Sequence, residues 1–336
     1  MKTAGFIALL TATLIAASTS FAVTIDIVPI GNPGNPPDMR YPSLGYPLGR
    51  GSVGYSFRMG KTEVTNAQYV EFLNAVAADD RYQLYFPFMT SSTQSGIVRN
   101  GTFRNFTYAV KPLALGDAYA YENKPVVFVE LPSAMRFANW LHNGQPHGPQ
   151  GPATTEDGAY TLARVFTDFG AVPRNPGARW WLPTPDEWYK AAYFDPISDT
   201  YWDYPTGTND PPNNRPPSGD TGNSANFFFN GYATGNLNYP LTDAGAYALS
   251  RSPYGTFDQA GNVREWNKRS GYGSVYSGGS WVDPGYWLSA RQIGDDEPQL
   301  TAHIGFRVAT VIPEPSTMLL GALGMVAVMW WRRRRS

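Results

Sequence analysis

The sequence predicts a single domain that mixes short helices and strands with long ordered loops. The 336-residue chain contains 34 Gly and 29 Pro, which favours short elements joined by many turns. Aromatic residues make up 15% of the chain and charged residues only 16%. A disordered chain has the opposite composition, and a coiled coil is rich in Ala, Glu, Lys and Leu. Both classes are therefore excluded.

Three helices are predicted from their start and stop signals. Thr65-Asn66-Ala67-Gln68 has the pattern of a capping box, and apolar residues follow it at helical spacing. A second helix is expected from about Ser133 until Asn143-Gly144, a typical stop signal. A third begins at Thr184-Pro185, with proline in its first helical position. It is expected to end before Pro196.

The remaining segments predict one strand and several long loops. Residues 53–59 alternate loosely and suit a strand. Residues 23–51 are rich in Pro and Gly, so they form either an extended lead-in packed on the domain or a stiff spacer. Residues 145–178 and 195–224 are interpreted as long loops, which are often functional. One domain over 52–310 accounts for this pattern.

The first residues have the features of a secretory signal peptide. A positive charge at Lys2 precedes an apolar run from Ala4 to Ala17, and Ser20-Phe21-Ala22 is a small-x-small cleavage pattern. We expect residues 1–22 to be removed on export, with cleavage after Ala22.

The last residues, 311–336, combine three unlike parts. Pro313-Glu314-Pro315-Ser316-Thr317 precedes an uncharged span that ends at Trp331, and four arginines, Arg332 to Arg335, follow it. The uncharged residues from Ser316 to Trp331 make ~24 Å of helix, and arginine side chains extend such a short transmembrane segment by reaching the membrane surface. The positive-inside rule keeps the arginines cytoplasmic.

This C-terminal segment resembles the PEP-CTERM sorting signal of Gram-negative bacteria. The resemblance implies anchoring in the membrane before processing by an exosortase-type enzyme. It also implies cleavage near the Pro-Glu-Pro box and delivery to the cell surface or an exopolysaccharide matrix. An exopolysaccharide or a surface protein is then a natural partner.

Charge and cysteine content exclude several functions. Without the two end segments the chain keeps 21 basic and 26 acidic side chains, a net charge near −5, which argues against nucleic acid as a partner. The chain contains no cysteine. It therefore has neither disulfides nor thiolates for catalysis or metal binding.

Six short blocks, taken in order, resemble the formylglycine-generating enzyme (sulfatase-modifying factor) family. The blocks are Gly60-Lys61-Thr62-Glu63-Val64-Thr65-Asn66-Ala67-Gln68-Tyr69, Lys124-Pro125-Val126-Val127, Arg179-Trp180-Trp181-Leu182-Pro183-Thr184, Gly261-Asn262-Val263-Arg264-Glu265-Trp266, Gly278-Gly279-Ser280-Trp281 and Ile304-Gly305-Phe306-Arg307-Val308. The resemblance implies an α+β, C-type-lectin-like fold with few regular elements and long loops. Arg307, in a mostly apolar run, is expected to form a buried ion pair.

The family's catalytic chemistry is what this sequence lacks. The resemblance implies oxidation of a substrate cysteine by Cu(I) held between two thiolates, but Asp283 lies near the position of the first of these cysteines. A carboxylate is a hard ligand that does not replace a thiolate for Cu(I). Related iron enzymes use a histidine cluster, and His142, His147 and His303 do not have that spacing. We therefore assign no catalytic residue and expect no copper.

The resemblance does imply structural calcium and a ligand-binding groove. One expected calcium site uses Asn226, the Phe227 carbonyl, Asp243 and the Gly245 carbonyl. The other uses Asp258, the Gly261 and Val263 carbonyls, and Glu265. The groove near the family's active site is expected to contain Trp281, Asp283, Tyr286, Trp287 and Arg291. Aromatic faces beside a carboxylate and an arginine suit a sugar or a peptide, although core packing accounts for Trp281 equally well.

Two functions follow as hypotheses. The first is an exported, surface-associated binding or matrix module without oxidase activity. The alternative is an enzyme of the sulfatase-modifying or another oxidoreductase type that works through different active-site chemistry.

Overall fold

The computed structural model describes residues 22–41, 49–116, 118–163, 165, 167–269, 274–292 and 300–312. Nearly all of the predicted signal peptide and the sorting signal from residue 313 onward lie outside these residues, as does the predicted transmembrane segment. Within the described part of the chain, no helix is long and apolar enough to cross a membrane.

All three predicted helices are confirmed. They are α1 (Asn66–Val76), α3 (Leu131–His142) and α4 (Pro185–Tyr193), and a one-turn helix, α2 (Phe88–Ser91), is added. Thr65 and Thr184 cap α1 and α4 through complete capping boxes, in which Gln68 and Glu187 return the hydrogen bond.

The strands form one four-stranded sheet, one three-stranded sheet and two hairpins. The larger sheet has the order β1-β2-β11-β5, with all neighbours antiparallel. The smaller has the order β10-β8-β9, in which β10 pairs in parallel with β8. The strands are β1 (Ile27–Ile30), β2 (Phe57–Gly60), β3 (Ile97–Asn100), β4 (Thr107–Val110), β5 (Trp180–Trp181), β6 (Phe194–Asp195), β7 (Thr200–Tyr201), β8 (Arg264–Lys268), β9 (Ser274–Ser277), β10 (Ile304–Gly305) and β11 (Ala309–Thr310).

The strand expected over residues 53–59 begins later, at Phe57 of β2. Tyr55 is drawn away from the ladder because its hydroxyl donates to Glu187 Oε1 at 2.5 Å and accepts from Arg174 Nη2 at 2.7 Å. In the proline-rich lead-in, residues 27–30 pair with β2 at the edge of the larger sheet. An edge strand tolerates Pro29, which has no N–H to donate.

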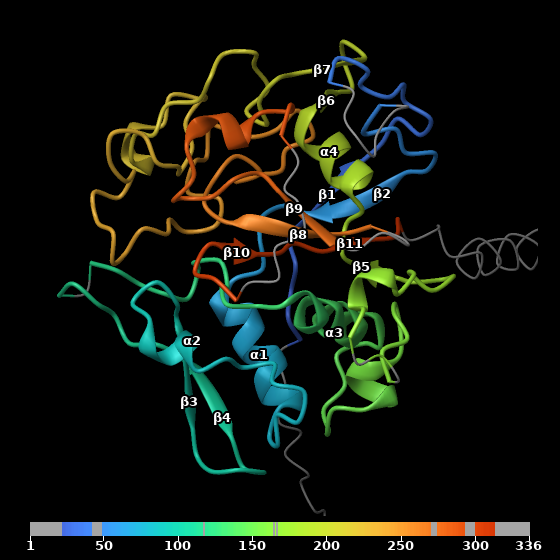
Figure 1. The fold of residues 1–336 in the computed structure, drawn as a ribbon, viewed down its shortest axis with the longest axis vertical. Helices are drawn as coiled ribbons and strands as arrows, with labels where there is room; N and C mark the ends of the chain where they lie inside the picture. The colour runs from blue at the N-terminus through green and yellow to red at the C-terminus, as the bar shows by residue number, and fades with distance from the viewer. Residues whose placement is uncertain are drawn as a thin grey trace, which may run out of the picture.

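The main core lies between the larger sheet and the helix pair α1 and α3. Figure 1 shows the sheets across the middle of the molecule, with α1 and α3 side by side below them and α4 with the long loops above. The rings of Phe72 and Trp140 lie 5.3 Å apart and join the two helices, while Phe137 packs edge-on against Phe306 at 5.4 Å. Aromatic pairs at these distances add to the stabilisation that burial provides.

Long loops fill most of the expected regions, with short turns of helix inside them, but the predicted loop over 195–224 also contains the hairpin of β6 and β7. Residues 145–178 contain η1 (Pro152–Glu156) and η2 (Phe169–Ala171), and η3 (Pro217–Gly219) lies in the later loop.

The predicted ion pair of Arg307 is confirmed: this fully buried guanidinium contacts Glu265 at 2.5 Å. It ties the segment between β10 and β11 to β8.

Candidate functional site

The candidate site is built on a glycine turn that follows β9. Gly278 and Gly279 have φ values of +95° and +67°, in the left-handed region that favours glycine. A Cβ atom on Gly278 would lie 2.9 Å from the Gln259 carbonyl oxygen. This turn leads to Trp281, whose backbone N–H donates to Asn262 at 3.0 Å, and then to the short helix η4 (Gly285–Leu288).

Asp283 forms a buried, two-pronged ion pair with Arg264 of β8. Arg264 Nε and Nη2 donate to its two carboxylate oxygens at 2.8 and 2.5 Å, and the Ser280 hydroxyl donates at 2.6 Å. The guanidinium also lies over the rings of Tyr276 at 4.6 Å and Trp287 at 5.4 Å. Bidentate pairs of this kind fix geometry, so Asp283 positions the surrounding residues.

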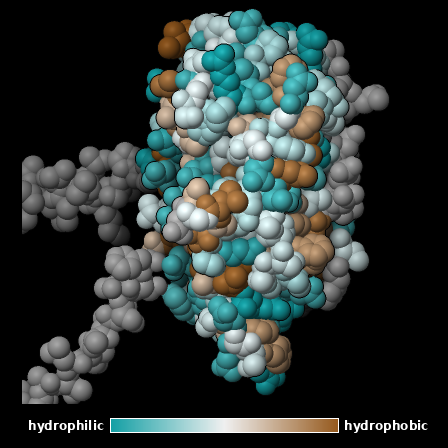
Figure 2. Space-filling model, turned by 90° about the vertical axis from the view of Figure 1, so that its left-hand side faces the viewer, coloured by the Kyte–Doolittle hydropathy of each residue, from teal (hydrophilic) through white to brown (hydrophobic). Residues whose placement is uncertain are grey.

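Two neighbouring backbone segments at this site carry exposed apolar side chains. The backbone N–H of Phe228 donates to the Asp283 carbonyl at 2.9 Å, so the segment around Phe228 runs beside residues 283–284. Phe228, Phe229 and Tyr286 are 39%, 62% and 55% exposed, and Val282 is exposed as well. We call these four residues the aromatic shelf. Figure 2 shows apolar side chains emerging in groups between polar ones on the side of the molecule where the long loops lie.

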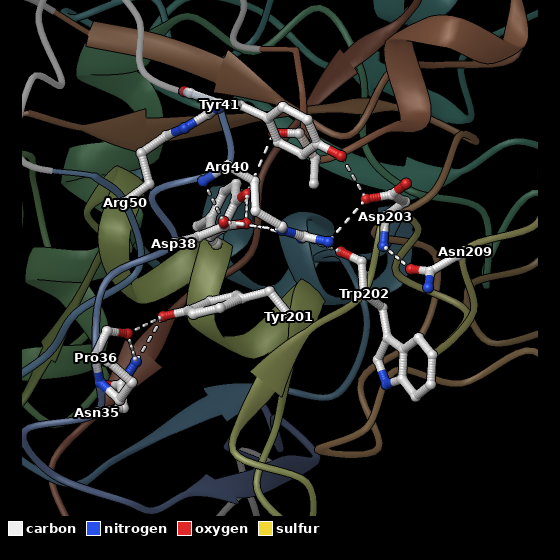
Figure 3. Close-up of polar contacts among 12 residues, drawn as sticks. Asn35, Pro36, Asp38, Arg40, Tyr41, Arg50, Tyr201, Trp202, Asp203 and Asn209 are labelled. Atoms are coloured by element: carbon white, nitrogen blue, oxygen red, sulfur yellow. Dashed lines mark hydrogen bonds and ion pairs between the residues drawn. The ribbon is translucent and has the colours of Figure 1, made fainter.

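Arg291 extends the site toward residues near the start of the chain. Its guanidinium lies 4.9 Å from the centre of the Tyr41 ring. Figure 3 shows the polar network that includes Tyr41: the Tyr41 hydroxyl donates to Asp203 at 2.7 Å, and Arg40 bridges Asp203 and Asp38. Burial opposes the charge of Asp38, but hydrogen bonds from Arg40 and Tyr189 outweigh it and lower the pKa of that carboxyl.

The five predicted groove residues are therefore divided between interior and surface. Trp281 is buried, its indole N–H donates to the Ala302 carbonyl at 3.1 Å, and Asp283 is occupied by Arg264. Tyr286 and Arg291 are exposed and Trp287 is half-buried between them in the sequence. The sequence interpretation missed Arg264 and the exposed rings at 228 and 229. The aromatic run Phe227-Phe228-Phe229 inside a loop was the signal for the rings.

The first expected calcium set contains an unused buried oxygen. Asn226 is buried and its Oδ1 atom has no hydrogen-bond partner, while its Nδ2 donates to Pro240 and Asn262. Asp243 is half-exposed and forms an ion pair with Lys124. These hard oxygens are the donors that calcium prefers. The set is compatible with calcium, provided that the cation displaces Lys124.

The second expected set is already neutralised by protein groups. Glu265 accepts hydrogen bonds from Arg307 at 2.5 and 2.6 Å and from the Trp188 indole at 2.8 Å. Burial raises the pKa of Asp258 to about 6. Burial, followed by the negative charges of Asp258 and Glu265, raises the pKa of Glu63. With Glu265 committed to Arg307, this set fits calcium poorly.

No group of three or more His, Cys, Asp or Glu side chains is placed to hold a metal ion in the described part of the chain. His142, considered earlier, accepts the backbone N–H of Arg179 through Nδ1 at 2.9 Å. It therefore acts as a structural acceptor at the end of α3.

Comparison with known proteins agrees with this geometry. Residues 38–312 match the model of the Sulfatase-modifying factor enzyme 1-like domain. The chain belongs to this family. Residues 311–334 match the PEP-CTERM protein-sorting motif, which indicates export to a cell-surface or extracellular destination and implies processing by an exosortase.

Solved structures support the fold of this family member. The crystal structure of CarF is 19% identical, with a TM-score of 0.53, and the alignment covers 86% of this chain and 99% of that chain. Treponema denticola variable protein 1 is 18% identical, with a TM-score of 0.52, and the alignment covers 88% and 98% of the two chains. At these identities the likeness shows the α+β fold alone. No curated protein matches the sequence.

Proposed function

We propose that this exported family member is a binding module that holds a saccharide of the cell surface or its matrix on the aromatic shelf. The observation that carries the proposal is the set of exposed rings, Phe228, Phe229 and Tyr286, on two backbone segments that are neighbours at Asp283, which is itself buried and paired with Arg264. Apolar rings held on a rigid base stack on the C–H face of a sugar with little loss of side-chain entropy.

The absence of cysteine supports binding over oxidation. The family resemblance implies a Cu(I) centre held by thiolates, and this chain contains none. The carboxylate of Asp283, near the first thiolate position, is bound to Arg264 and Ser280 instead. Nothing in that arrangement suits a soft cuprous ion.

A titration with fragments of the producing cell's own exopolysaccharide tests the proposal, with heat of binding as the measurement. We expect Tyr286→Ala and Phe229→Ala each to weaken binding about tenfold, the equivalent of ~1.4 kcal/mol. Phe103→Ala removes a ring of similar exposure in the loop between β3 and β4, away from the shelf, and provides the matched control.

Three outcomes would contradict the proposal. One is equal loss of affinity in the control variant. Another is binding of extended peptides while no saccharide binds, which would favour a protein partner. The third is formylglycine, detected by mass spectrometry after incubation with a cysteine-containing sulfatase peptide and copper, which would restore the enzyme alternative.

A further inference from the structure

One side chain holds both backbone groups of Val23. The Val23 N–H donates to Gln145 Oε1 at 2.6 Å, and Gln145 Nε2 donates to the Val23 carbonyl at 2.9 Å. Gln145 follows the end of α3 with a φ of +61°, an uncommon conformation for a residue that is not glycine. Its own N–H donates to Trp140 at 2.9 Å, which fixes the turn. The turn thus presents a carboxamide to residue 23.

The contacts continue along the chain from Val23 onward. Gln68 Nε2 donates to the Thr24 carbonyl at 3.0 Å, and the Lys61 N–H donates to the Asp26 carbonyl at 2.7 Å. Residues 27–30 then pair in β1. Among the described residues, Val23 is thus the first whose backbone groups both bind the domain. It directly follows the bond at which the sequence predicts signal-peptide cleavage.

Ala22 borders a cavity of about 230 Å³ that also touches Gln145. Glu71 of α1 and His147 are the titratable groups that line it. An ammonium group placed beside Ala22 would therefore share this small cavity with the carboxylate of Glu71.

We propose that this cavity and Gln145 form the docking site for the new N-terminus that removal of the signal peptide creates. Hydrolysis of the Ala22–Val23 bond by a signal peptidase consumes one water, leaving a carboxylate on Ala22 and an ammonium group on Val23. The ammonium keeps the hydrogen bond to Gln145 Oε1, now charge-assisted and stronger than that of an amide N–H. Its two additional N–H donors occupy the space that Ala22 vacates.

The docked ammonium makes stability depend on pH in a defined direction. A free α-amino group has an ordinary pKa near 7.7–8.0, and docking beside Gln145 and Glu71 raises the folded-state pKa above that value. The stabilisation that the docked ammonium provides is complete below about pH 7.7 and is lost as the pH rises through the folded-state pKa.

Two chains that differ only in their first residues provide the test. One runs from Val23 to Ser336 with a native N-terminus, the other from Ser20 to Ser336, and both are melted in the same detergent. We expect the Val23 chain to melt about 2–4 °C higher at pH 7 and the difference to vanish at pH 10. Gln145→Asn tolerates the same backbone conformation but shortens the side chain, so it should abolish the difference.

The N-terminal sequence of the exported protein provides an independent readout, and we expect it to begin at Val23. Equal melting temperatures at pH 7 would overturn the proposal. So would a difference that persists at pH 10 or in Gln145→Asn, or cleavage at another bond. Glu71→Gln should reduce the difference without changing the melting temperature of the longer chain.

Discussion

At the scale of single residues, the burial of charged side chains carries a free-energy cost in this domain. Arg307 and Glu265 are wholly buried, and the guanidinium also donates to the carbonyls of Gly60 and Phe257. Removing two charges from water costs several kcal/mol, which is recovered only when every donor and acceptor is satisfied. This pair is satisfied on both sides, so it fixes the position of the last strands relative to β8.

Lys190 is a buried charge that no carboxylate pairs with among the residues that the structure describes. It is buried on α4 and donates to the Asn32 carbonyl at 2.7 Å, and desolvation lowers its pKa to about 8. In the unfolded chain its pKa returns to about 10.4. Between these two values the unfolded chain binds a proton that the folded chain does not. Stability should therefore rise with pH across this window.

Urea unfolding at intervals from pH 7.5 to 10.5 measures that rise. We expect Lys190→Met to show a smaller increase in unfolding free energy over this range than the unchanged protein. Lys61→Met keeps the same change in charge at a less buried position and should leave the increase intact. Parallel pH profiles for the Lys190 variant and the unchanged protein would contradict the assignment.

At the scale of elements, α4 depends on its first turn. The Thr184 hydroxyl accepts the Glu187 N–H at 3.1 Å, and Glu187 in turn accepts from the Thr184 N–H at 2.7 Å and the Trp181 indole at 3.0 Å. We expect Thr184→Ala to lower the unfolding free energy by about 1 kcal/mol, because a helix N–H loses its partner. Chemical denaturation gives the value.

Thr184→Ser retains the hydroxyl and should recover most of that stability. Thr161→Ala, which removes a hydroxyl from an exposed loop, is the control for loss of a threonine. If Thr184→Ser is as destabilised as Thr184→Ala, the hydrogen bond is not the cause of the loss.

A difference between helices and strands explains which elements the sequence could predict. Helix ends are encoded by a few neighbouring residues, so Thr65 and Thr184 identify α1 and α4 correctly. Strands of two residues, such as β5 and β11, owe their existence to partners more than a hundred residues away, and no local pattern records them. In the site, Trp281 and Asp283 were assigned to a ligand-binding groove, but both side chains are buried. The sequence does not identify the partners that hold them in the interior, which are Arg264 and the Ala302 carbonyl.

At the scale of the whole molecule, a domain with long loops and no disulfide needs other links between distant segments. Ion pairs provide some of them: Lys124 contacts Asp243 across more than a hundred residues. The Lys124 ammonium is held over the Tyr119 ring at 4.5 Å. It occupies the carboxylate that the first expected calcium set would use. A calcium ion at the first expected set would have to compete with this lysine for Asp243.

Competition between Lys124 and calcium predicts that two substitutions change the calcium dependence of the melting temperature in opposite directions. Calcium bound only to the folded protein raises its stability with concentration, by ~2.7 kcal/mol at a hundred times the dissociation constant. We expect Asp243→Asn to abolish the calcium-dependent rise in melting temperature. Lys124→Met should bring about the same rise at a lower calcium concentration, because the competing ammonium is gone. Asp210→Asn, an exposed carboxylate in another loop, should behave like the unchanged protein. If each of the four proteins melts at the same temperature in calcium as in EGTA, Asn226 and Asp243 do not form a calcium site. The ion pair between Lys124 and Asp243 alone then joins these loops.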